Sequence, residues 1–332
     1  MTTRCRRRSA PRHTDPALLR TAGPAGGALL AGRYRLAERV GRGASADVWR
    51  ARDELLDREV AVKQFHEPHT HSLIEARLAA RVRHPNVAAV HDVVGHGSAY
   101  SLVMDYCGGT NLVALLRGEG RLPESVVAML GLQLLAALQA VHASGVVHCD
   151  VKPANLMLDD DGRLVLIDFG IAEINGSDPA HPARRSGDVI GSPAYMAPEL
   201  VLGGAPRPAS DLWSLAATLY TAVEGIPPFR QDDDVPTLTA VLHDPPSPTR
   251  RAGRLQPVLD RLLVKEPADR ASPDVVHALL TDACPTTPPV LTAQRTAPDR
   301  DGAEPTISTP IPRLLGPSWG NVGWGRRLIG TA

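Results

Sequence analysis

Hydrophobic and polar residues alternate along residues 33–65, and glycines interrupt the pattern near its middle. A period of two is typical of strands that bury one face. This stretch therefore predicts a strand, a tight glycine loop, a second strand, a turn and a third strand. The apolar runs 87–94 and 100–106 predict two more strands. Residues 71–82 have helical periodicity and predict one helix, which ends before His84-Pro85.

Helical spacing replaces alternation in the later part of the chain. Pro123-Glu124-Ser125 is a good helix start, and no Lys, Arg, Asp or Glu occurs from Ser125 to Val147. That stretch is long enough to cross a membrane. Its apolar residues recur at helical spacing and are mixed with Gln133, Gln139 and His142. The pattern favours a buried core helix over a membrane span.

Three further helices are predicted beyond this one. Ser210-Asp211 opens an apolar helix that Gly225 and Pro227-Pro228 end. The others are expected near 255–265 and 273–281. A small antiparallel sheet with one helix, followed by mainly helical sequence, predicts an α+β fold.

The predicted elements divide the chain into three parts. Residues 1–32, rich in Arg, Gly and Pro, predict a flexible arm. Residues 33–283 form one folded domain, with a small lobe over 33–106 and a large lobe over 107–283. Residues 284–332 are rich in Pro and Thr and predict a disordered tail.

Composition narrows the class of protein. With 36 basic and 36 acidic residues the formal net charge is zero, which argues against a nucleic-acid-binding protein. The four cysteines have no zinc-ligand spacing, so reduced thiols and a cytoplasmic location are expected. No apolar stretch of a secretory signal follows the N-terminal arginines. Only three lysines occur, Lys63, Lys152 and Lys265, so each is a candidate for a role that arginine cannot fill.

The first candidate site is the glycine loop at Gly41–Val48, between two predicted strands. Glycines let the backbone approach phosphates, and successive N–H groups can bind the anion. Alone, such a loop is more often a simple hairpin turn. Lys63 follows Val48 by fifteen residues, at the end of a predicted strand, where it can pair with nucleotide phosphates. The alternative, an exposed strand lysine, is weakened by the scarcity of lysine.

The second candidate site joins His148–Asn155 to Asp168-Phe169-Gly170. Asp150 can accept the proton of an attacking hydroxyl, and Lys152 can neutralise charge on a phosphoryl group. Asn155 and Asp168 can offer oxygens to Mg²⁺, a cation that prefers oxygen ligands. One acid alone would be read as a solvated loop residue, but this ordered set predicts phosphoryl transfer.

Taken together with Ala197-Pro198-Glu199, these motifs resemble those of eukaryotic-type Ser/Thr protein kinases of bacteria, especially actinobacteria. The resemblance covers about 33–283 and implies the two-lobed protein kinase fold. It implies that Glu75 pairs with Lys63 and that Asp211 holds the catalytic-loop backbone. It also implies that Arg270 pairs with Glu199. The nucleotide-binding residues that it implies are Val40, Gly41, Gly43, Ser45, Val48, Ala61, Lys63, the gatekeeper Met104, the hinge residues Asp105 and Cys107, and Met157.

One departure from the family pattern concerns regulation. Cys149 precedes Asp150, where many members have an Arg that binds a phosphate on the activation segment. Residues 171–196 contain no Thr, and serines only at 177, 186 and 192. Ser192 stands where members often have a Thr that contacts the catalytic Asp and Lys. Ser186 stands where bacterial relatives often carry a phosphate.

The resemblance implies transfer of the γ-phosphoryl of ATP to protein Ser or Thr hydroxyls, with Mg²⁺, or Mn²⁺ in its place. It also implies protein substrates and transient self-association for autophosphorylation. One alternative is a pseudokinase scaffold that binds nucleotide and partners without turnover. A small-molecule phosphotransferase would lack the Glu199 motif and Arg270, and a phosphate-binding module would not explain Asp150, Asn155 and Asp168 together.

Overall fold

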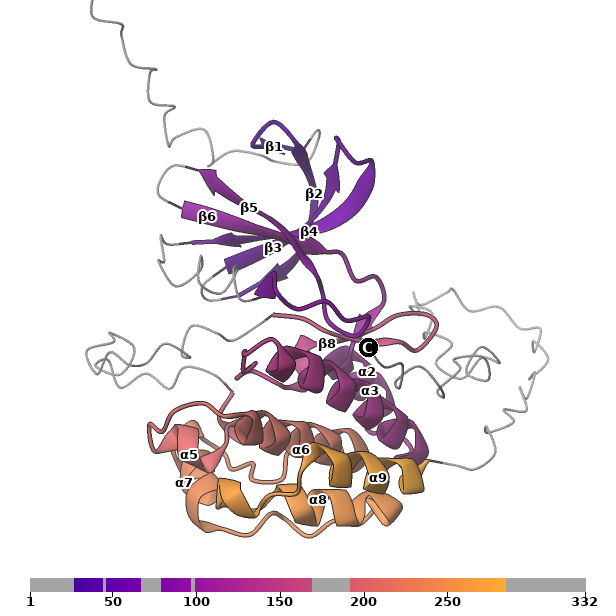
Figure 1. Ribbon diagram of the computed structural model, residues 1–332, viewed down its shortest axis with the longest axis vertical. Helices are drawn as coiled ribbons and strands as arrows, with labels where there is room; N and C mark the ends of the chain where they lie inside the picture. The colour runs from indigo at the N-terminus through magenta and orange to yellow at the C-terminus, as the bar shows by residue number, and fades with distance from the viewer. Residues whose placement is uncertain (1–26, 44–45, 67–78, 97–98, 169–191, 285–332) are drawn as a thin grey trace, which may run out of the picture. The chain divides into compact units, whose positions relative to one another are not determined.

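The computed structural model describes residues 27–43, 46–66, 79–96, 99–168 and 192–284 (Figure 1). The described residues fall into two compact units. The first comprises 27–66 and 90–106, and the second comprises 79–89 and 107–284, each within the described ranges.

The first unit is one antiparallel sheet in the order β1-β2-β3-β4-β6-β5. Its strands are β1 (Leu29–Leu30), β2 (Tyr34–Arg42), β3 (Ala46–Asp53), β4 (Arg58–Phe65), β5 (Val90–His96) and β6 (Ala99–Asp105). The predicted strand-loop-strand-turn-strand pattern of 33–65 is confirmed as β2, β3 and β4.

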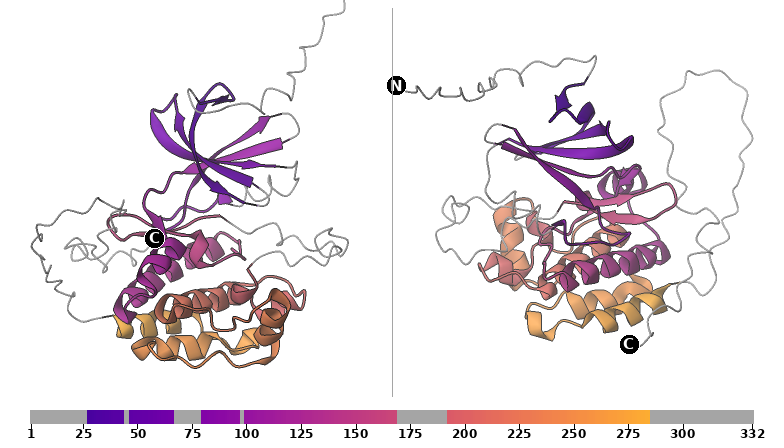
Figure 2. Two further views of the ribbon diagram at one scale, coloured as in Figure 1. Left: turned by 180° about the vertical axis from the view of Figure 1, so that it is seen from behind. Right: turned by 45° about the horizontal axis from the view of Figure 1, so that its top comes forward.

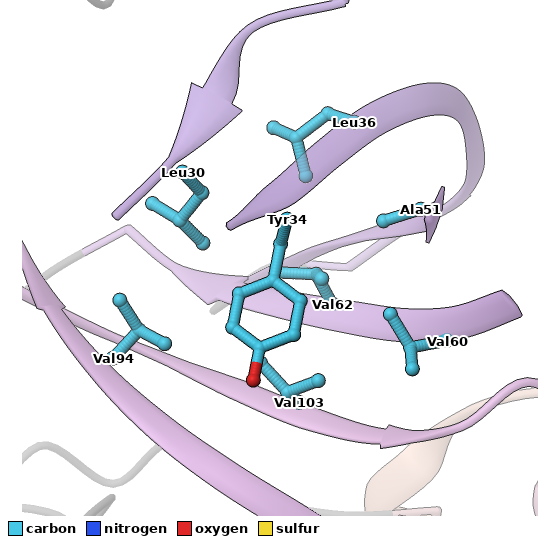
Figure 3. Close-up of a cluster of buried hydrophobic side chains, with 8 residues drawn as sticks. All are labelled: Leu30, Tyr34, Leu36, Ala51, Val60, Val62, Val94 and Val103. Atoms are coloured by element: carbon cyan, nitrogen blue, oxygen red, sulfur yellow. The ribbon is translucent and has the colours of Figure 1, made fainter. Parts of the chain in front are cut away.

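The sheet buries one face in a hydrophobic cluster built around Tyr34 (Figure 3). Val60 and Val62 of β4 and Val103 of β6 are fully buried there. Because successive side chains of a strand point to opposite faces, Ala61 and Lys63 lie on the other face of β4. The full cluster is Leu30, Tyr34, Leu36, Ala51, Val60, Val62, Val94 and Val103.

A buried carboxylate closes the β3–β4 turn. Asp53, at the end of β3, is fully buried and accepts hydrogen bonds from Arg33 Nε at 2.8 Å and Nη2 at 2.7 Å. The backbone N–H groups of Leu55 and Leu56 also donate to Asp53 Oδ1. The hydrogen bonds from Arg33 lower the pKa of Asp53 from 3.8 to about 2, against the opposing effect of burial.

The second unit is mainly helical. Its α-helices are α2 (Leu112–Glu119), α3 (Glu124–Ala143), α5 (Pro198–Val201), α6 (Pro208–Glu224), α7 (Asp234–His243), α8 (Gln256–Leu262) and α9 (Pro273–Ala283). Short 3-10 turns are η2 (Pro153–Asn155), η4 (Pro193–Tyr195), η5 (Gly253–Leu255) and η6 (Pro267–Asp269). A small antiparallel sheet has the order β7 (Thr110–Asn111), β8 (Leu156–Leu158) and β9 (Leu164–Leu166).

The helix α3 is the core of the second unit. It contacts β9, and also α6 and α9, beside which it lies in Figures 1 and 2. Within the described residues it is also the one helix long and apolar enough to cross a membrane, and 61% of its most apolar window is buried inside the unit. This packing supports the prediction of a buried core helix.

Several elements differ from the predicted ones. The run 87–94 does not form one strand, because Ala88 N–H donates to Leu166 O and β5 begins only at Val90. The helix predicted at Ser210 begins two residues earlier, at Pro208, and ends before Gly225, whose φ of 86° gives the expected left-handed cap. The helix α7 was not predicted. The helix expected over 71–82 lies largely outside the described residues, as do most of the predicted arm and the tail after Cys284.

The Asp53 carboxylate allows a test of the first unit. Asp53→Asn should lower the free energy of unfolding by about 1.5–3 kcal/mol, because hydrogen bonds to an ionised acceptor are lost from a buried site. The wild type should lose this stabilisation as the pH falls from about 4 towards 2. The pKa of Asp53 is lower in the folded protein than in the unfolded chain, so protonation of its carboxylate favours unfolding. Urea denaturation as a function of pH measures both effects.

The matched control is Asp57→Asn in the same turn. The Asp57 side chain is 83% exposed and pairs with the exposed Arg52, so its loss should cost less than about 1 kcal/mol. Equal losses in the two variants would contradict the proposed anchoring role of Asp53.

Candidate active site

Four of the predicted nucleotide-binding residues share one face of the first unit's sheet. The register pairs Val48 of β3 with Lys63 of β4, and Ala61 of β4 with Met104 of β6. This face is opposite to the one that holds Val60, Val62 and Val103. Cross-strand pairing thus places apolar side chains of three strands beside the amine of Lys63.

The glycine loop connects β2 to β3 in the same unit. Gly41 lies opposite Val48, and Gly43 N–H donates to Ala46 O at 2.9 Å. Val40 lies where the register of β2 shifts, and 48% of its surface is exposed. The loop is therefore a hairpin with two strands as its stems, as predicted. Ser45 lies outside the described residues.

The predicted hinge residues end one unit and begin the next. Asp105 closes β6, and its Oδ1 accepts a hydrogen bond from His91 Nε2 at 2.7 Å. Cys107 is half-buried in the second unit. Met157, the last predicted adenine contact, lies on β8 opposite Asn111 and Val165. His91 carried no sequence signal, because nothing in the spacing links it to Asp105.

The catalytic loop is anchored by one buried carboxylate. Asp211 of α6 is fully buried and accepts hydrogen bonds from His148 N–H at 2.8 Å and Cys149 N–H at 2.9 Å. His142 Nε2 of α3 donates to the same carboxylate at 2.7 Å. Cys149 has a φ of 67°, in the left-handed region that non-glycine residues seldom adopt. The bonds to Asp211 hold the backbone in this conformation, as the resemblance implied for Asp211.

Asp150 comes directly after the residues that Asp211 holds, and one of its carboxylate oxygens has partners in the loop. Its Oδ2 accepts from Asn155 Nδ2 at 2.8 Å and lies 2.7 Å from Lys152 Nζ. Within the described residues Asp150 Oδ1 takes part in no hydrogen bond, and 27% of the side chain is exposed. Asp150 N–H donates to Nδ1 of His148, whose pKa is lowered by burial. A neutral imidazole can accept this bond, so the loop positions Asp150 with one oxygen open to a hydroxyl group.

The predicted metal ligands Asn155 and Asp168 lie near each other along the backbone of the second unit. Asn155 is nearly buried, and its amide nitrogen donates to the backbone and side-chain oxygens of Asp150. Its carbonyl oxygen is thus left for another partner. Ile167 N–H donates to Asn155 O at 2.9 Å, which brings Asp168 beside Asn155. No group of three His, Cys, Asp or Glu side chains in the described ranges could hold a metal ion. Two protein oxygens suit a cation that takes its other ligands from phosphate and water.

The Glu199–Arg270 pair is bidentate and buried. Arg270 Nη1 and Nη2 donate to the two carboxylate oxygens of Glu199 at 2.8 and 2.7 Å. The remaining N–H groups of Arg270 donate to the carbonyls of Val264, Lys265 and Ala209. Burial raises the pKa of Glu199, but hydrogen bonds from Arg270 and Ser210 outweigh it and lower the pKa. Since both charges are partnered, removing one would cost about 3–5 kcal/mol.

The third lysine has a structural role that its scarcity could have indicated. Lys265 Nζ donates to Val241 O at 2.6 Å and lies 4.1 Å from the centre of the Phe229 ring. Burial lowers the pKa of Lys265 to about 8. A compact ammonium fits at the C-terminal end of α7, where carbonyls are unpaired, better than a planar guanidinium does.

The remaining regulatory residues are placed only in part. Ser192 precedes η4, and within the described residues its hydroxyl makes no hydrogen bond to Asp150 or Lys152. Its predicted contact with them stays a prediction. Glu75 and Ser186 lie outside the described residues.

Comparison with known proteins agrees with this geometry. The protein kinase domain family matches residues 34–281. The serine/threonine-protein kinase PknA of Mycobacterium tuberculosis is 36% identical over 261 residues, which cover 74% of this chain and 60% of PknA. The serine/threonine-protein kinase pkn3 of Myxococcus xanthus is 32% identical over 336 residues, covering 89% of this chain and 59% of pkn3. The DNA damage-responsive serine/threonine-protein kinase RqkA of Deinococcus radiodurans is 39% identical over 229 residues, covering 66% and 34%.

The chain thus spans about 60% of the length of the first two of these relatives. All three are Ser/Thr kinases of bacteria by name, and the family match takes in both described units. The catalytic loop, its Asp211 anchor and the Glu199–Arg270 pair lie within the matched residues. The chain belongs to the protein kinase domain family, and it is similar to bacterial eukaryotic-type Ser/Thr kinases of that family.

Proposed function

We propose that this protein transfers the γ-phosphoryl group of ATP to Ser or Thr hydroxyls of protein substrates. The observation that carries the proposal is how the two carboxylate oxygens of Asp150 are bonded. Lys152 and Asn155 engage its Oδ2, and Oδ1 stays open to a substrate hydroxyl. Lys152 and Ser192 also favour Ser or Thr over Tyr as acceptor, by resemblance to the family.

In the proposed reaction, Asp150 orients the acceptor hydroxyl and takes its proton as the new oxygen–phosphorus bond forms and ADP leaves. Lys152, 2.7 Å from Asp150, neutralises charge on the phosphoryl group in transfer. A divalent ion, Mg²⁺ with Mn²⁺ as the alternative, supplies further charge neutralisation when bound. Asn155 and Asp168 would hold that ion, and Lys63 and Glu75 would position the ATP phosphates.

The setting that we propose follows from two further observations. The four cysteines have no zinc-ligand spacing, and the chain is too long for a disulfide scaffold, which supports a reducing, cytoplasmic location. Chains that phosphorylate each other must meet transiently, so we propose self-association during autophosphorylation. No nucleic-acid partner is proposed, because the net charge is zero.

The first prediction concerns Asp150→Asn. Phosphoryl transfer should fall by about 10²–10⁴-fold, because the proton acceptor is lost. ATP binding should change little, since Asp150 is not among the predicted nucleotide contacts. Initial rates on a generic protein substrate, with ATP binding measured in parallel, separate the two effects.

Asp160→Asn is the matched control for this variant. Asp160 is an exposed acid ten residues further along the chain, so its loss should leave the rate unchanged. Wild-type turnover in Asp150→Asn would overturn the proposed mechanism. If the wild type itself binds ATP without turnover on any substrate, the scaffold alternative is correct.

The second prediction concerns Ser186→Ala. Cys149 cannot form an ion pair with a phosphate on the activation segment, so this variant should keep a substantial part of the wild-type rate. The rate on an added protein substrate should be compared for untreated wild type, phosphatase-treated wild type and Ser186→Ala, with Ser177→Ala as the matched control. A loss above about a hundredfold in the treated and Ser186→Ala forms, ~2.7 kcal/mol on the barrier, would mean that another basic residue binds the phosphate.

A further inference from the structure

A cavity of about 660 Å³ opens in the second unit where α6 ends, remote in sequence from the catalytic loop. Tyr220 and Glu224 of α6 line it, together with the following Ile226. Arg121 borders it from the turn before α3, and the segment 247–251 closes it. Its volume lies within the ~300–1,000 Å³ range of ligand pockets.

The walls of this cavity are fixed by hydrogen bonds. Glu224 Oε1 accepts the backbone N–H groups of Arg250 at 2.8 Å and Arg251 at 2.7 Å. Tyr220 donates its hydroxyl to Ser247 O at 2.9 Å. Leu122 N–H donates to Ala222 O at 2.8 Å, which ties the turn that carries Arg121 to α6. The cavity is therefore a preformed feature of the fold.

The cavity is positively charged. Three arginines, Arg121, Arg250 and Arg251, line it, and Glu224 is the one carboxylate among its lining residues. Within the described residues, none of the three guanidinium groups forms a salt bridge or a hydrogen bond. Such like charges repel one another and favour binding of an anionic group, which guanidinium can bind in a bidentate way. Ile226, half exposed beside them, adds an apolar contact.

The chain itself contains a complementary segment. The carboxylates of residues 285–332 are Asp299, Asp301 and Glu304, and all of them fall in one six-residue window with Arg300. That window has a net charge of −2, and the four charged residues that line the cavity have a net charge of +2. Ala303 and Pro305 beside the acids are small and apolar, which suits contact with Ile226.

The cavity lies within reach of this segment. The helix α9 ends at Ala283, and Asp282 O accepts a hydrogen bond from Arg254 Nη1 at 3.4 Å. Arg254 follows the cavity residue Arg251 by three positions. The fifteen residues that follow Cys284, up to Asp299, can span up to about 50 Å, so the chain can easily reach the cavity. Tethering also gives the segment an effective concentration in the ~mM range.

We propose that residues 299–304 of this chain dock in the arginine-lined cavity at the end of α6. The acidic side chains pair with Arg121, Arg250 and Arg251 there. The interaction is intramolecular and sensitive to salt, because exposed ion pairs supply its free energy.

Hydrogen–deuterium exchange of the full-length protein tests this docking. Amides of 299–304 should exchange at least about threefold faster in the cavity variant Arg121→Gln/Arg250→Gln and in Asp299→Asn/Asp301→Asn/Glu304→Gln than in the wild type. The cavity variant keeps the backbone bonds to Glu224, so exchange in α3 and α6 should not change. The matched control Arg117→Gln/Arg261→Gln removes two exposed arginines outside the cavity and should behave as the wild type.

A charge exchange gives an independent readout. Arg121→Glu/Arg250→Glu should lose the protection, and adding Asp299→Arg/Asp301→Arg should restore it. Equal exchange of 299–304 in the wild type, the cavity variant and the control would overturn the proposal. So would protection that increases with protein concentration, because the occupant would then come from a second copy. No step uses ATP or Asp150, so the result is separate from the proposed kinase activity.

Discussion

The buried carboxylate of Asp211 is the constraint on which the candidate active site depends. The two carboxylate oxygens of Asp211 accept hydrogen bonds from three N–H groups. Two of these are the consecutive backbone amides of His148 and Cys149 in the catalytic loop. A conformation with φ of 67° at Cys149 would be unfavourable in an isolated chain by about 1–3 kcal/mol. A buried N–H group without an acceptor is unfavourable, so the hydrogen bonds to Asp211 keep the catalytic loop in this conformation. Asp150, Asn155 and Asp168 inherit their positions from it through a short chain of hydrogen bonds.

The Glu199–Arg270 pair fixes the positions of separate segments in the helical part of the second unit. Every N–H group of the guanidinium has an acceptor, and these acceptors come from three separate places along the chain: Glu199, Ala209 and the adjacent pair Val264-Lys265. A single side chain thereby fixes the segment after the activation region against α6 and the turn before η6. Such a fully satisfied network specifies one arrangement even where its net contribution to stability is small.

The sequence predicted what is local or ordered by spacing. Alternation over 33–65 follows from a sheet with one buried face, and so β2, β3 and β4 could be placed. Position within ordered motifs identified Asp150 and Asn155, because their chemistry requires those side chains, whereas Asp211 was identified only by resemblance to the family. Contacts that join distant segments could not be placed from the sequence. Two of them use a side chain, His142 with Asp211 and Lys265 with the end of α7, and one joins the backbones of Ala88 and Leu166. The helix α7 was also missed, because it buries only Thr237, Ala240 and Val241 and so carries no long apolar stripe.

The way in which Cys149 is held bears on how this kinase can diverge. The two bonds that fix the loop at His148 and Cys149 run through backbone amides, so the loop geometry does not require a particular side chain at 149. Its backbone conformation excludes mainly β-branched residues. Related chains can therefore differ at position 149, the residue that would bind a phosphate on the activation segment, while Asp150 next to it keeps its position and its role. The regulatory position and the catalytic residue are adjacent in the sequence, yet substitutions at the first can accumulate without changing the second.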